Sequence, residues 1–112
     1  MKKVTVESIV KNIEVVQNSS EFAVVENKIT FVGFVGKKGY RGKLGDSILR
    51  VIAKQCEVRL VEEMKISSKG LPYTVATIDT KGLKADEVTY LIDLANKAMK
   101  KNADNYKASK AK

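Results

Sequence analysis

The sequence predicts an α+β domain in which helices alternate with pairs of strands. Two observations support this prediction. Apolar residues recur at helical spacing in three separate segments, near the start, in the middle and close to the end of the chain. Between them lie two segments rich in Val, Ile and Thr, each interrupted by turn-forming residues. The expected order is α-β-β-α-β-β-α, giving a single domain with a mostly antiparallel four-stranded sheet and helices packed on one face.

The first helix is expected over residues 5–17, because Val6, Ile9, Val10, Ile13 and Val16 follow helical spacing. Thr5 is a suitable N-cap for this helix. A polar break, QNSSE, follows, and the sequence FAVVENKITFVGFV then predicts two strands. Their hairpin turn falls at Glu26-Asn27, where left-handed backbone geometry is tolerated.

The second half of the chain predicts a helix, another hairpin and a last helix. GDSILRVIAKQC is the second helix, with Asp46 or Ser47 as its N-cap. EVRLVEEMKI is a strand with a bulge at its paired glutamates, SSKG is a turn, and LPYTVATID is a strand. Pro72 indicates that this last strand begins at an edge or just after the turn.

The last helix shows the clearest periodicity, with Asp86 and Glu87 in its first turn and lysines near its end. These charges suit the helix dipole. We place the domain at residues 1–101 and interpret residues 102–112, which are rich in lysine, as a disordered tail.

Composition excludes several classes of function. The chain has no histidine and one cysteine, Cys56, which removes imidazole catalysis, the usual zinc ligand sets and an intramolecular disulfide. Glu62 and Glu63 are adjacent on a strand, so they cannot act together as acid and base. No apolar run is long enough to span a membrane. We therefore expect a cytoplasmic protein without catalytic residues, metal or cofactor.

Charge indicates the class of partner. The chain carries 21 Lys and Arg against 13 Asp and Glu, a net charge of +8. A surface this basic favours encounters with polyanions such as nucleic acid.

The sequence GFVGKKGYRGKLG, residues 33–45, contains five of the seven glycines of the chain, at every third position. It is too short and lacks the proline of collagen, and it matches neither the dinucleotide-binding fingerprint nor the P-loop. Glycine allows backbone N–H groups to approach phosphate closely, and the following helix N-terminus adds positive potential. The segment therefore predicts contact with an anionic ligand.

We assign nucleic-acid binding to a loop at residues 36–45, with single-stranded nucleic acid favoured. Tyr40 would stack on a base while neighbouring cations meet phosphates. The predicted side-chain contacts are Lys37, Lys38, Tyr40, Arg41 and Lys43, with support from Arg50, Lys100 and Lys101. The predicted backbone contacts are Gly36, Gly39, Gly42 and Gly45.

The eleven residues GKLGDSILRVI are similar to the GxxG loop and following helix of KH domains. In that family the loop clamps the nucleic-acid backbone, which is the mechanism that the likeness implies here. KH domains enter this loop from a helix, whereas residues 29–35 of this chain predict a strand.

Two other interpretations of the loop remain open. It could dock on an acidic or nucleic-acid-binding surface of a protein partner, as a phage inhibitor or a regulatory adaptor would. It could also be only a connection between a strand and a helix. The sequence equally leaves open a homodimer formed by pairing of sheet edges.

Overall fold

The computed structural model describes residues 1–15, 21–32, 43–66 and 69–110. It confirms the predicted α+β class, the element order and the antiparallel four-stranded sheet. The elements are α1 (Val6–Val10), β1 (Glu21–Val25), β2 (Lys28–Val32), α2 (Lys43–Cys56), β3 (Leu60–Ile66), β4 (Pro72–Asp79) and α3 (Ala85–Lys110).

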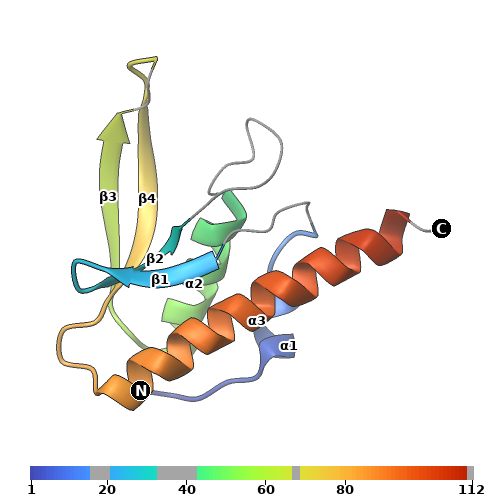
Figure 1. Ribbon diagram of the computed structural model, residues 1–112, viewed down its shortest axis with the longest axis horizontal. Coiled ribbons are helices and arrows are strands. Elements are labelled where there is room, and N and C mark those ends of the chain that lie inside the picture. Colours follow the sequence, from blue (N-terminus) through green and yellow to red (C-terminus); the bar gives the residue numbers. More distant parts are fainter. Residues whose placement is uncertain (16–20, 33–42, 67–68, 111–112) are drawn as a thin grey trace.

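The sheet has the strand order β1-β2-β4-β3 and is built from two hairpins. Strands β2 and β4 join them through two residue pairs, Lys28↔Asp79 and Ile29↔Ile78. The hairpins therefore diverge, and β1–β2 crosses the base of β3–β4 at a wide angle (Figure 1). The far half of the β3–β4 hairpin extends beyond this junction.

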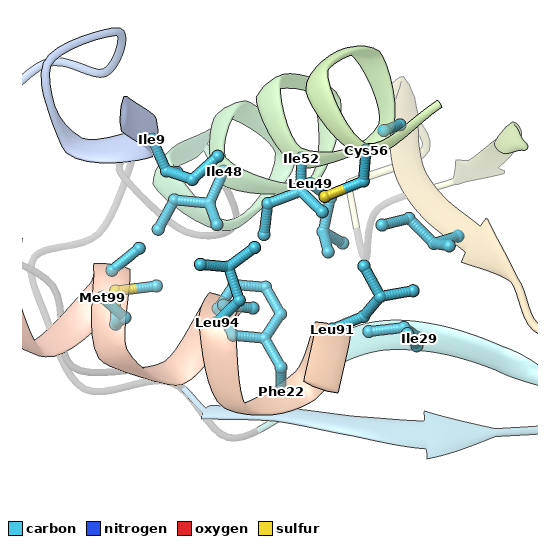
Figure 2. Close-up of a cluster of buried hydrophobic side chains, with 14 residues drawn as sticks. Ile9, Phe22, Ile29, Ile48, Leu49, Ile52, Cys56, Leu91, Leu94 and Met99 are labelled. Atoms are coloured by element: carbon cyan, nitrogen blue, oxygen red, sulfur yellow. The ribbon is translucent and has the colours of Figure 1, made fainter. Parts of the chain in front are cut away.

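The core lies between one face of the sheet and the three helices, as Figure 2 shows. Strand β1 contributes Phe22, strand β2 contributes Ile29 and strand β4 contributes Ile78, all less than 5% exposed. The helices contribute Ile9, Ile48, Leu49, Ile52, Ala53, Cys56, Leu91, Leu94, Ala95, Ala98 and Met99. On the opposite face Val75 and Thr77 are also buried, so that face is not uniformly open to solvent.

Helix α1 is shorter than the prediction of residues 5–17. Thr5 is its N-cap as predicted, and its Oγ1 accepts a hydrogen bond from the Ser8 N–H. The helix ends at Val10, and the Asn12 side chain donates to the Ser8 carbonyl in the turn that follows. A run of β-branched residues favours extended backbone and competes with helix, which accounts for the early end.

The middle of the chain differs from the prediction in two details. Helix α2 begins at Lys43, so Asp46 lies within its first turn and neither Asp46 nor Ser47 is the N-cap. Strand β3 pairs with β4 in unbroken register from Leu60↔Ile78 to Ile66↔Pro72, so the predicted bulge at the glutamates is absent from these pairs. Pro72 is the first residue of β4, as predicted.

Helix α3 continues to Lys110, past the predicted domain end at residue 101. Asn102 is fully buried, and its Nδ2 donates to the Glu14 carbonyl at 2.8 Å, which ties this part of the helix to the segment after α1. The residues that follow include Ala and Lys, which are good helix formers. Residues 102–110 are therefore helical in the structure, where the sequence predicted a disordered tail.

Candidate nucleic-acid interface

Most of the predicted loop falls outside the described residues. Those positions are Gly36, Lys37, Lys38, Gly39, Tyr40, Arg41 and Gly42. The remaining loop positions, Lys43 and Gly45, lie in the first turn of α2. Strand β2 precedes this segment and helix α2 follows it. The chain thus departs from KH domains as the sequence indicated.

Helix α2 is firmly held by the core. Ile48, Leu49 and Ile52 have no exposed surface, and Cys56 at the end of the helix is also fully buried. This apolar stripe fixes the helix against the sheet and α3, because shifting it would expose several large side chains to water. The N-terminal turn at Lys43 is therefore a fixed point from which the glycine-rich segment departs.

Asp46 connects this N-terminal turn to β4. Its Oδ1 accepts a hydrogen bond at 3.1 Å from the backbone N–H of Ala76, a residue with no exposed surface. Burial raises the pKa of the Asp46 carboxyl, against the opposing effects of this hydrogen bond and of Arg50. The only acidic residue in the first turn of α2 is thus engaged with the sheet. The sequence carries no signal for this contact, because Ala76 lies 30 residues away.

Arg50 lies two turns after Lys43, about 10 Å along the helix axis. Its guanidinium is 3.4 Å from Glu62 on β3, and both side chains are about half exposed. The carboxylate partly offsets the positive charge of Arg50. The structure therefore places Arg50 beside the sheet, in an exposed ion pair with Glu62.

Lys100 and Lys101 follow Met99 on α3. In Figure 2, Ile48 of α2 and Met99 of α3 lie at one end of the core, and Cys56 lies at the other. Lys100 is 3.5 Å from Asp104, an exposed pair on successive turns. Lys101 is exposed and makes no ion pair with another described residue. Exposed pairs of this kind hold a lysine weakly, so both remain accessible to a ligand.

The positive charge is concentrated in two parts of the chain. Residues 33–45 hold four basic residues and no acidic one, and residues 97–112 hold six lysines and one aspartate. The rest of the chain has eleven basic and twelve acidic residues and is nearly neutral. Lys43, the last basic residue of the first region, begins α2, and α2 starts at the end of the core near Met99, where the second region begins.

Glu62, Glu63 and Cys56 are each engaged in structural contacts. Glu62 pairs with Arg50, whereas Glu63 pairs with Lys28, so the two glutamates point to opposite faces as predicted. Cys56 is buried, and burial raises the pKa of its thiol.

The described residues contain no cluster of three or more candidate metal ligands. Within the same residues, no helix has the length and apolar character needed to cross a membrane.

The chain matches no protein-family model, and neither the curated proteins nor the solved structures contain a significantly similar chain.

Proposed function

We propose that this protein binds nucleic acid through the glycine-rich and lysine-rich loop at residues 36–45 and the N-terminus of α2. The observation that supports the proposal best is the distribution of charge. Half of the net charge of +8 lies in one thirteen-residue segment without acidic residues, and that segment leads directly into the first turn of a helix fixed by the core.

The proposed mechanism combines backbone and side-chain contacts with phosphate. Glycines leave the backbone N–H groups accessible, and the first turn of α2 has N–H groups without partners inside the helix. Asp46 would otherwise repel an anion at this turn, but its Oδ1 faces the Ala76 N–H of β4. Lys37, Lys38, Arg41 and Lys43 would neutralise phosphates, and Tyr40 would stack on a base.

Lys100 and Lys101 extend the proposed surface. They lie on the helix that packs beside α2, near the end of the core from which the loop departs. Contacts of lysine with phosphate add affinity without sequence information, so we expect binding with little base specificity. Single-stranded nucleic acid is the favoured ligand because stacking on Tyr40 requires an unpaired base.

The test is fluorescence anisotropy with labelled single-stranded DNA, duplex DNA and RNA across a salt series. The loop variant changes Lys37, Lys38, Arg41 and Lys43 to Ala. Its control changes Lys11, Lys54, Lys81 and Lys84 to Ala, four exposed lysines elsewhere that remove the same total charge.

We expect the native chain and the control variant to bind single strands at physiological salt and the loop variant to lose most of that affinity. Each lost phosphate contact should also flatten the dependence of log K on log salt by about 0.7 for a single strand. Equal losses of affinity in both variants would show that binding depends only on the total charge of the protein, which would contradict a site at the loop. Absence of binding by the native chain would favour a protein partner for the same loop.

A further inference from the structure

The outer edge of β3 combines a free row of backbone groups with exposed apolar side chains. Strand β3 is last in the order β1-β2-β4-β3, and among the described residues no strand pairs with its outer side. Met64 is 77% exposed and Ile66 is 72% exposed, the two highest values among the large apolar side chains of the described residues. Figure 1 shows β3 at the margin of the molecule, in the hairpin half that projects past β2.

The hydrogen-bond pattern identifies which groups of β3 point outward. The Asp79 N–H donates to the Arg59 carbonyl, so residues 59 and 79 form a hydrogen-bonded pair. In an antiparallel ladder such pairs alternate, so Val61, Glu63 and Lys65 direct their backbone groups toward β4. Glu62, Met64 and Ile66 therefore direct their N–H and C=O groups away from the sheet.

Exposed strand edges in proteins are normally guarded by charge, because they are templates for pairing with another chain. The charged residues on this edge are Glu62, Glu63 and Lys65, and the two that lie on either side of Met64, Glu63 and Lys65, have opposite signs. They repel a neighbouring strand only when like charges meet. In one register of self-pairing, unlike charges meet instead.

We propose that two copies of this chain pair through the outer edges of β3, antiparallel, with Met64 at the two-fold axis. In this register Met64 faces Met64 of the second copy, and Glu62 faces Ile66, so all three outward-pointing residues form hydrogen-bonded pairs. Glu63 faces Lys65 of the second copy twice, at positions without backbone hydrogen bonds, where side chains approach most closely. The result is a continuous eight-stranded sheet.

Charge selects this register over its neighbours. A two-fold axis at Glu62, Glu63 or Lys65 would put the same charged residue opposite itself. An axis at Val61 would include only Leu60–Glu62 of each strand and leave Met64 and Ile66 outside the pairing. The axis at Met64 is near the end of β3 at Ile66, which places the body of each copy toward the far end of the paired segment.

Glu63 already accepts a hydrogen bond from Lys28 Nζ, on the sheet face that Lys65 shares. A carboxylate has room for both lysines, because its two oxygens offer about four acceptor positions. Lys28 thus holds Glu63 in place for the second copy. The proposal does not depend on nucleic-acid binding, because it involves the opposite margin of the sheet from β1 and no residue of the loop.

Sedimentation velocity over a concentration series from about 5 to 500 µM tests the proposal, since a single strand-to-strand contact gives a small and therefore weak interface. We expect a reversible dimer for the native chain. Lys65→Glu and Glu63→Lys should each weaken dimerisation about tenfold or more, because both cross-strand pairs become like-charged. The double variant Glu63→Lys with Lys65→Glu should restore much of it, because the cross-strand pairs are again of unlike charge, although Lys28 then meets a like charge at position 63.

Lys81→Glu is the matched control, because it makes the same charge change at an exposed lysine far from β3 and should leave the dimer intact. A native chain that stays monomeric throughout, or a dimer that neither single charge reversal weakens, would overturn the proposal. A monomer that instead recruits a different protein through this hairpin would overturn it as well.

Disulfide trapping tests the register directly. Met64→Cys should give a covalent dimer under mild oxidation, because residues of a hydrogen-bonded pair have Cα atoms about 5.5 Å apart. Glu62→Cys should not, since the two copies of residue 62 would be about 13 Å apart along the strands. The native chain is the control for Cys56, which is fully buried. Equal trapping at both positions would contradict the register.

Discussion

The two hairpins of this sheet have the same antiparallel geometry but different relations to the core. In β1–β2, Phe22 and Ile29 are buried beneath the helices. In β3–β4, Ile78 at the base of the hairpin is buried as well, but Met64 and Ile66 project past the helices and are exposed. Alternation of apolar residues thus indicates a strand with one apolar face, but it does not indicate whether anything in the same chain covers that face.

Both hairpins are attached to a helix by the same kind of contact. On β1, the Phe22 N–H donates to Asn96 Oδ1 of α3 at 2.9 Å. On β4, the Ala76 N–H donates to Asp46 Oδ1 of α2 at 3.1 Å. In each case a helix side chain satisfies a strand N–H that would otherwise need a neighbouring strand. The first acceptor is neutral and the second is a carboxyl group, so only the second should respond to pH.

The largest expected difference comes from the same substitution in each hairpin. Ile29→Ala removes a side chain with no exposed surface and should lower the free energy of unfolding by about 2–5 kcal/mol. Ile66→Ala removes one that is 72% exposed and should change it by about 0.5 kcal/mol or less. Urea denaturation of the two variants at low protein concentration measures both values. Similar losses would show that the hairpin tip is packed in solution.

A smaller effect is expected at Asp46. Asp46→Ala leaves the buried Ala76 N–H without its acceptor and should cost about 1–3 kcal/mol, whereas Asp46→Asn can keep a carbonyl acceptor and should cost less. Thermal or urea unfolding of both variants makes the comparison. Equal stability of the Ala variant and the native chain would mean that the hydrogen bond contributes nothing.

Asp46 also gives a pH dependence with a defined sign. Burial raises its pKa, so the folded protein retains this proton to higher pH than the unfolded chain. Its contribution to stability is therefore greatest at low pH and declines as pH rises from the unfolded pKa through the folded one. Asp46→Asn should remove this decline. A decline of stability with pH that is equal or steeper in that variant would contradict its assignment to Asp46.

The turns of the two hairpins should respond in opposite directions. Glu26 and Asn27 have φ of 52° and 63°, and a non-glycine side chain is strained there. Glu26→Gly should therefore stabilise the protein by up to about 1 kcal/mol. Gly70, near the other turn, has φ of 81°, and Gly70→Ala should destabilise by about 1 kcal/mol despite the open space around it. Changes in the free energy of unfolding that have the same sign in the two variants would contradict this account.

The smallest expected effect concerns the Lys28–Glu63 pair that joins the hairpins. The hydrogen bond from Lys28 holds the pKa of Glu63 below its usual value. Stability from this pair is present above the unfolded pKa of Glu63 and is lost as pH falls through the folded pKa. In Lys28→Gln the pKa of Glu63, followed by NMR, should rise toward the ordinary value. An unchanged pKa would show that the pair is not formed in solution.

Local pattern was sufficient to predict the elements and their order. The hairpin turn at Glu26-Asn27 was predicted from residues that tolerate left-handed geometry, and both have positive φ. The early end of α1 was not predicted, because helical spacing was given more weight than the β-branched residues. The continuation of α3 was not predicted either, because it includes a contact far apart in sequence. Asn102, which binds the Glu14 carbonyl, makes this contact.

The sequence was sufficient to select the residues of the candidate site but not to predict how they are arranged in space. Glycine spacing and charge selected residues 36–45, yet nothing in the sequence indicated that Asp46 would face β4 or that Arg50 would pair with Glu62. Both contacts join segments that the fold alone brings together. The exposure of Met64 is similar, because it depends on how far the hairpin extends past the helices.

The most direct test of the proposed function is to map a single-stranded oligonucleotide onto the protein by NMR. The account predicts that backbone amide resonances of residues 36–45 shift most at physiological salt, that smaller shifts occur around Lys100 and Lys101, and that β3 is unaffected. Shifts spread evenly over all lysine-bearing surfaces, or confined to the β3–β4 hairpin, would contradict a nucleic-acid site at the loop.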